Sequence, residues 1–265
     1  QNLILDSNYF LLDIYNKILV LIEKFEVNKL LRLKQQLISP KYNLDKAEHL
    51  VLINYLLNIL AKQLRLGKHE YLEHIVELHQ YIFKERLFDK TSYIPHSFFE
   101  NVVSISCAIG NFLWLDEWIT EYGSYVQRKY RENTLLLSKV QISFSKGLYQ
   151  DVIQEYNEIV INNDYYRLRV RLILLCCYSV MYEEDLQLFE FQIRNFNKLL
   201  QRREVFSSSI TEAARNVSDL LISVAKLKDI KRVSTSEKKG LLDLVESHDN
   251  IFHKSWIINR INNLS

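Results

Sequence analysis

The hydrophobic positions in the middle of this chain repeat every 37 residues. Bulky apolar residues follow the spacing i, i+3, i+7, i+10, which places them on one face of a helix. The first stripe begins at Phe112, the second at Tyr149 and the third at Leu186, each 37 residues after the one before. The stripes are Phe112, Leu115, Ile119 and Tyr122; Tyr149, Val152, Tyr156 and Ile159; and Leu186, Phe189, Ile193 and Phe196. A fixed period of this length is typical of a helical repeat array, in which each unit buries its apolar face on its neighbours.

A second stripe precedes each of these with the same offset and the helical spacing i, i+4, i+7. These residues are Phe99, Val103 and Ser106; Leu136, Val140 and Ser143; and Ile173, Cys177 and Val180. Each unit therefore predicts a helix A, a short turn and a helix B, over roughly 95–130, 132–163 and 165–203. Gly110 and Gly147 fall in the first two turns, where a residue that tolerates positive φ ends a helix at little cost. Glu184 stands at that position in the third unit.

The rest of the chain also reads as helices. A periodic stretch from Asn8 to about Ile38 predicts one long helix or two that divide near Glu26. Only five Gly and two Pro are present, too few for the many turns of a strand-rich fold. We expect an all-α fold, a right-handed α-solenoid of tetratricopeptide-like helix pairs. Its expected parts are N-terminal helices that continue the array (1–90), three repeats (95–203) and C-terminal helices that cap it (207–265).

Composition narrows the class of protein. The net charge of +2 gives no whole-protein attraction to nucleic acid or anionic membrane. Three cysteines, two of them adjacent at Cys176 and Cys177, do not form a disulfide framework, so we expect a reducing, cytoplasmic location. The most apolar run, residues 172–182, is far shorter than the ~20 residues of a membrane-spanning helix, so no membrane insertion is expected.

Catalytic and metal-binding patterns do not emerge from the sequence. His69, His74 and His79 lie five residues apart, which turns successive side chains to different faces of a helix and disfavours a zinc site. The acidic groups at 116–117 and 183–185 fall at turns or first helical turns, where carboxylates complement the helix dipole. Phosphate-binding, dinucleotide-binding and nucleophile-elbow motifs are absent. We therefore expect a protein that is not an enzyme and has no catalytic residue, cofactor or metal.

The repeat units resemble tetratricopeptide repeats with a longer period than the usual 34 residues. Bulky residues stand where such repeats carry small ones at helix contacts, so the helices should pack less closely. The chain more closely resembles a family of uncharacterised tetratricopeptide-like proteins from Bacteroidetes bacteria. The resemblance covers residues 95–262, and its carrying segments are 98–103, 112–119, 131–133, 147–149 and 197–202. It implies an α-helical repeat fold and no established activity, and it assigns no functional residues.

In arrays of this kind the A helices line the concave surface. On the face of the third A helix opposite its apolar stripe lie Arg171 and Tyr178, residue types that often anchor interfaces. Equivalent positions in the earlier units carry small or polar residues, among them Gln141 and Asn101. We expect this face to bind a protein or peptide, with Arg171 and Tyr178 as anchors and Gln141 and Asn101 as polar contacts. Packing of the same face against the terminal helices is an open alternative.

A second functional hypothesis is an RNA- or DNA-binding helical repeat protein. This hypothesis rests on two basic clusters, at residues 128–131 and 226–239, whose side chains could contact phosphates. Stacking residues at equivalent repeat positions, which a repeat code for RNA uses, are not apparent. The predicted function is therefore a non-enzymatic interaction scaffold, with nucleic-acid binding as the alternative.

Overall fold

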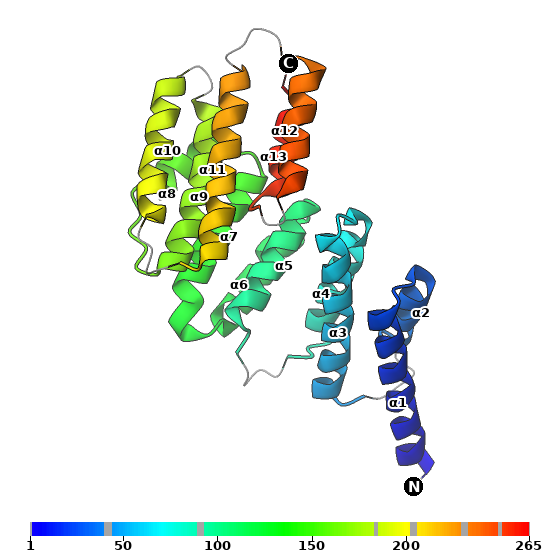
Figure 1. Cartoon of the computed structure of the whole chain (residues 1–265). Coiled ribbons are helices and arrows are strands. Elements are labelled where there is room, and N and C mark those ends of the chain that lie inside the picture. The colour runs from blue at the N-terminus through cyan, green and yellow to red at the C-terminus, as the bar shows by residue number, and fades with distance from the viewer. Residues whose placement is uncertain are drawn as a thin grey trace. The chain divides into compact units, whose positions relative to one another are not determined.

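The chain is all-helical in the computed structural model (Figure 1). The structure describes residues 2–39, 44–88, 93–182, 185–201, 206–228, 233–248 and 251–264, with the backbone alone at 2–8 and Arg65. Within these ranges there are thirteen α-helices, two short 3₁₀ helices and no strand, and one isolated parallel bridge joins Ile94 to Val126. The prediction of an all-α fold is confirmed.

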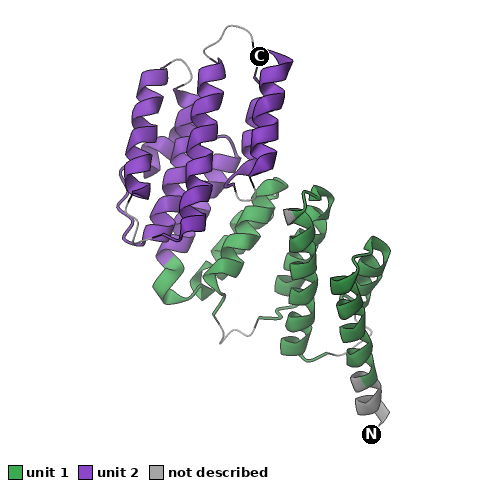
Figure 2. Ribbon diagram, in the orientation of Figure 1, with its two compact units in different colours: residues 1–131 green, residues 132–265 purple. Residues whose placement is uncertain are grey.

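Contacts along the chain divide it into two compact units, which we call the N-terminal unit (residues 1–131) and the C-terminal unit (residues 132–265) (Figure 2). The division falls inside one helix, α7, which runs over Arg128–Ser145. The expected boundaries at 90–95 and 203–207 stay predictions, and each unit is described by itself.

The N-terminal unit begins with two helices joined by three residues, 24–26. The chain is extended at Glu26, and this extended residue ends the helical run and starts the next helix at Val27. The predicted division near Glu26 is therefore present. Buried faces of α1, α2 and α3 contact one another and form the core here. The helices of the unit are α1 (Asn2–Glu23), α2 (Val27–Leu37), α3 (Lys46–Arg65), α4 (Leu72–Lys84), α5 (His96–Ala108) and α6 (Phe112–Tyr122), with 3₁₀ helices η1 (His69–Tyr71) and η2 (Gly123–Tyr125).

The C-terminal unit is organised around α9 (Asp164–Met181), which contacts α8, α10 and α11. The Asn163 side chain accepts hydrogen bonds from the backbone N–H groups of Tyr165 and Tyr166 and so caps this helix. Another hydrogen bond of the unit joins α13 to α8: the indole N–H of Trp256 donates to the Tyr149 hydroxyl over 3.2 Å. The remaining helices are α8 (Tyr149–Tyr156), α10 (Leu186–Leu200), α11 (Ser208–Lys228), α12 (Thr235–Ser247) and α13 (Lys254–Asn262).

The 37-residue period reappears in the helix boundaries. Helices α6, α8 and α10 begin at Phe112, Tyr149 and Leu186, the residues that open the three predicted B stripes. Gly110 and Gly147 in the preceding turns have φ of +71° and +76°, as the turn prediction requires. Glu184, at the equivalent place in the third unit, lies outside the described residues.

The three B helices differ in length more than the stripes suggest. Helix α8 has 8 residues, against 11 in α6 and 15 in α10. Ile159, the last residue of the second stripe, therefore lies beyond the end of its helix. The β-branched run at 159–161 and the capping Asn163 follow at once, and both favour a non-helical backbone over one more turn. The central stripe residues Leu115, Val152 and Phe189 are all buried.

Candidate functional site

The site that gathers predicted binding residues lies on α9, the most buried helix of the C-terminal unit. Every residue from Leu172 to Ser179 on this helix is buried. Helices α8 and α10 both pack against α9, and this packing covers residues that an amphipathic surface helix would leave open. Polar groups on α9 therefore need partners inside the unit.

Arg171 and Tyr178 meet at one acceptor, the side-chain Oδ1 of Asn157. Arg171 donates to this oxygen through Nη1 over 3.2 Å, and the Tyr178 hydroxyl donates to it over 2.6 Å. Asn157 directly follows the last residue of α8, so the hydrogen bonds join the end of one helix to two turns of the next. Burial raises the pKa of Tyr178 to about 12, with the Tyr182 phenol adding to the effect and the Arg171 charge opposing it. The phenol is therefore protonated at neutral pH and remains a donor.

This group forms part of the wall of a cavity of about 470 Å³ between α9 and α10. Helix α10 contributes an aromatic ring, Phe191, which is 50% exposed, and two amide side chains, Gln192 and Asn195. Arg167 also lines the cavity and pairs with Asp164 on the same helix. No acidic residue is among the described side chains that line the cavity. The cavity thus combines cationic and amide groups with an exposed aromatic surface.

The structure brings together two of the four predicted contact residues. Tyr178 is only 4% exposed, so its ring belongs to the interior, in contrast to the expectation of an anchor in an open groove. Arg171 is half-buried at the cavity wall. Gln141 is half-buried on α7 and does not line this cavity, and Asn101 is exposed on α5 in the N-terminal unit. Contacts by Gln141 and Asn101 stay predictions.

Sequence reasoning missed the residues that complete the cavity. Asn157, Phe191 and Asn195 belong to the ends and outer faces of B helices, whereas the expected surface was on the A helices. The one signal available was the polar outer face of α10 next to an aromatic residue. A polar position beside a helix end does not by itself identify its partner, so Asn157 could not have been chosen from the sequence.

The N-terminal unit holds a buried cation that the sequence did not reveal. Lys34 of α2 is buried, and its ammonium contacts Glu77 and, over 3.2 Å, Nδ1 of His74. Burial lowers the pKa of Lys34. Lys34 and Glu77 border a cavity of about 490 Å³ that Trp114 also lines. Because Glu77 already compensates the Lys34 charge, this arrangement is an ion pair between the buried Lys34 of α2 and the exposed Glu77 of α4.

The three histidines considered as a metal site lie in different environments. His79 is buried against Phe98, with ring centroids 5.3 Å apart, whereas His74 contacts Lys34 and His69 is exposed. In the described part of the chain, no three His, Cys, Asp or Glu side chains are placed to hold a metal ion. The acidic residues at 183–184 lie outside the described residues, as do residues 229–232 of the second basic cluster.

No helix among the described residues is long and apolar enough to cross a membrane. Comparison with known proteins gave no match to this chain among family models, curated proteins or solved structures.

Proposed function

We propose that this chain is a non-enzymatic, cytoplasmic interaction scaffold that binds a protein or peptide segment at the α9–α10 cavity. In this proposal the A–B helix pairs are tetratricopeptide-like repeats of a right-handed α-solenoid. Support comes from the helix starts at Phe112, Tyr149 and Leu186, which keep a period of 37 residues, and from the turn glycines between paired helices. The resemblance to the Bacteroidetes tetratricopeptide-like family also implies an α-helical repeat fold.

The observation that carries the binding proposal is the position of Arg171. Its guanidinium is held by a neutral amide oxygen, Asn157 Oδ1, which fixes the side chain without neutralising its charge. A carboxylate from a bound segment could therefore pair with Arg171 in the acid-free cavity, through the planar fork that guanidinium offers to carboxylate. Because Asn157 already orients the side chain, little rotamer entropy is lost on binding.

The other cavity residues define what accompanies the carboxylate. Phe191 offers an exposed aromatic surface to an apolar side chain, and Gln192 and Asn195 offer amides to a peptide backbone. Aromatic and arginine side chains are the residue types that most often dominate interface energies. The proposed ligand is therefore a peptide segment with an acidic residue next to an apolar one. Tyr178 is a positioning residue, since it is buried and acts through Asn157.

The test begins with affinity capture by the whole chain from cells of its native organism, with mass spectrometry of what is retained. Binding of the purified partner is then compared among the wild type, Arg171→Gln, Phe191→Ser and Arg194→Gln. Arg194 is an exposed residue of α10 outside the cavity lining, so its change is the matched control. We expect Arg171→Gln and Phe191→Ser to weaken binding by roughly tenfold or more, as for interface anchors, and the control to have little effect.

Salt dependence separates this proposal from the nucleic-acid alternative. Nucleic-acid binding weakens steeply with salt because phosphates neutralised by Lys and Arg release their counterions. A cavity that relies on one carboxylate and an aromatic contact should depend far less on salt. A salt-sensitive nucleic-acid complex with no protein retained would contradict the proposal, as would a partner that binds Arg171→Gln and Phe191→Ser as tightly as the wild type.

A further inference from the structure

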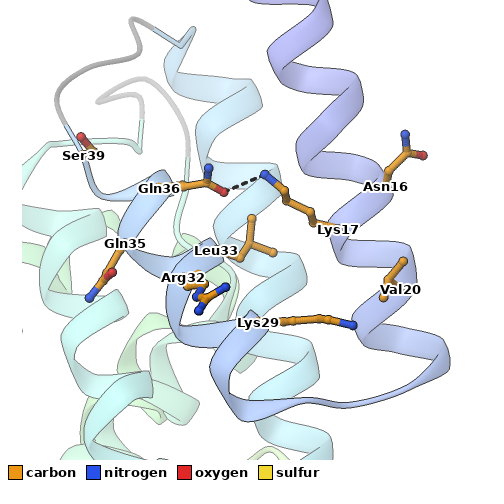
Figure 3. Close-up of a pocket in the computed structure, with 9 residues that line it drawn as sticks. All are labelled: Asn16, Lys17, Val20, Lys29, Arg32, Leu33, Gln35, Gln36 and Ser39. Atoms are coloured by element: carbon orange, nitrogen blue, oxygen red, sulfur yellow. Dashed lines mark hydrogen bonds between the residues drawn. The ribbon is translucent and has the colours of Figure 1, made fainter.

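Another cavity of the N-terminal unit, of about 810 Å³, lies between α1 and α2 (Figure 3). Its volume falls within the range common for ligand sites. Val20 and Leu33 supply apolar surface, and the other lining residues are polar or cationic. They are Asn16, Lys17, Lys29, Arg32, Gln35, Gln36 and Ser39. We call this feature the α1–α2 groove.

The α1–α2 groove is lined by cations and by no acid among the described residues. Figure 3 shows the Lys17 and Lys29 side chains reaching across the space between the two helices. Lys17 donates to Gln36 over 3.1 Å and pairs with Asp13, and Lys29 pairs with Glu26 over 2.9 Å. These ion pairs are exposed and local in sequence, so they contribute little to stability and can exchange partners.

Arg32 differs from the two lysines. It is exposed at the groove, and no acidic side chain of the described residues forms an ion pair with it. A guanidinium binds a carboxylate through two parallel hydrogen bonds, so Arg32 offers a directional site for an acidic side chain. Gln35 and Gln36 on the same helix provide amides beside it.

An apolar stripe on α1 borders the groove. Tyr9, Leu12 and Leu19 are 71%, 59% and 57% exposed, and with Asn16 they follow the spacing i, i+3, i+7, i+10 along one face. Asn16 also lines the groove, so stripe and groove are adjacent. From Tyr9 to Leu19 the stripe extends over roughly 15 Å at the helical rise. Exposed apolar side chains that gather on one face mark an interaction surface.

We propose that the α1–α2 groove and its apolar stripe dock an acidic amphipathic helix of a partner protein. Its carboxylates pair with Arg32 and Lys29, and its apolar side chains cover Val20, Leu12 and Leu19. This is the helix-in-groove mode of recognition, with anchors at i, i+3 or i+4, and i+7. A small anion would leave the long apolar stripe uncovered. A phosphate backbone has no apolar side chains with which to cover the stripe. The surface lies in the N-terminal unit and does not depend on the α9–α10 cavity.

The test is an unbiased selection of 14-residue helical peptides on the whole chain, followed by fluorescence anisotropy with each selected peptide. The groove variant is Lys29→Glu with Arg32→Glu. The control is Lys62→Glu with Lys139→Glu, two exposed lysines outside the groove, which changes the net charge equally. A third variant, Leu12→Ser with Leu19→Ser, probes the stripe without altering the cations. Circular dichroism confirms that each variant is folded.

The expected peptides are rich in Asp and Glu, with Leu or Ile at helical spacing. They should bind the wild type and the control alike, and bind the groove variant roughly tenfold or more weakly. The serine variant should weaken binding as well, and binding to the wild type should fall as salt rises, because charge pairs are screened.

Several results would overturn the inference. Peptides without acidic enrichment, or with equal affinity for the groove variant, would do so, as would a selection that yields no groove-dependent binder. A wild type that self-associates in sedimentation, with a monomeric groove variant, would assign the surface to a second copy of the chain. Peptides that lose affinity with Arg171→Gln and keep it with the groove variant belong to the α9–α10 cavity, so the two proposals fail separately.

Discussion

The hydroxyl groups of Thr134 and Tyr166 share a hydrogen bond of 2.8 Å in the interior of the C-terminal unit. Both side chains are at most 1% exposed, and they belong to the consecutive A helices α7 and α9. Removing one partner of a buried pair leaves the other without its hydrogen bond, which costs more than removing both. The pair is therefore a buried polar contact between two A helices of this unit.

The first prediction concerns this pair. Thr134→Val and Tyr166→Phe should each lower the free energy of unfolding by about 1–3 kcal/mol, and the double variant should lose less than the sum. Denaturant unfolding of the four proteins measures the coupling. Thr120→Val is the control, since the Thr120 hydroxyl bonds at the surface to a carbonyl of its own helix, and its effect should stay within about 0.5 kcal/mol. Additive losses would show that the pair is not coupled.

The second prediction concerns pH. Burial lowers the pKa of His79 to about 3, and among the described residues its Nδ1 has no hydrogen-bond partner. The unfolded chain takes up this proton near pH 6.5, so between about pH 6.5 and 3 it binds a proton that the folded chain does not. Stability should therefore fall as the pH falls, with His79 responsible for about 2 kcal/mol of the loss between pH 7 and 5.

The variant His79→Leu should remove that part of the pH dependence, as measured by urea unfolding at several pH values. His69→Leu, at an exposed position, should retain the dependence of the wild type. A His79→Leu protein that loses as much stability as the wild type on acidification would contradict the assignment.

The third prediction compares two glycines that both have room for a methyl side chain. Gly147 has φ of +76°, whereas Gly240 lies inside α12, and no atom would come within 4 Å of a Cβ at either site. Gly147→Ala should lower the free energy of unfolding by about 1–2 kcal/mol because an L-residue is strained there. Gly240→Ala should raise it by about 0.5–1 kcal/mol through helix propensity. Thermal unfolding that gives both changes the same sign would contradict the turn geometry.

The fourth prediction follows from the burial of Tyr178. Tyr178→Ala should lower the free energy of unfolding by about 3–5 kcal/mol, since it empties space in the core. Tyr178→Phe keeps the ring and loses only the hydrogen bond to Asn157, for about 1 kcal/mol. Equilibrium unfolding distinguishes the two, with Tyr182→Phe on the partly exposed neighbouring ring as the control. Similar small losses for both Tyr178 variants would mean that the ring lies in an open groove.

Local sequence patterns were sufficient to predict the helical fold and many of its boundaries. The starts of α6, α8 and α10, the glycine turns before two of them and the break at Glu26 all depend on neighbouring residues. Periodicity and turn chemistry act over a few positions, so the chain itself displays them. The early end of α8 was not predicted, because the apolar stripe continues to Ile159; the β-branched run at 159–161 was the local signal for it.

The sites depended on contacts between residues far apart in the sequence. Arg171 and Tyr178 were predicted, but Asn157, which holds both, lies 14 and 21 residues away on the other side of a turn. Lys34 and Glu77 are 43 residues apart, and no sequence pattern around either residue predicts the ion pair between them. The sequence alone determined where the helices form, because helix formation is local. Only the tertiary structure decided which faces are covered and which polar groups meet, because burial and pairing arise when helices pack.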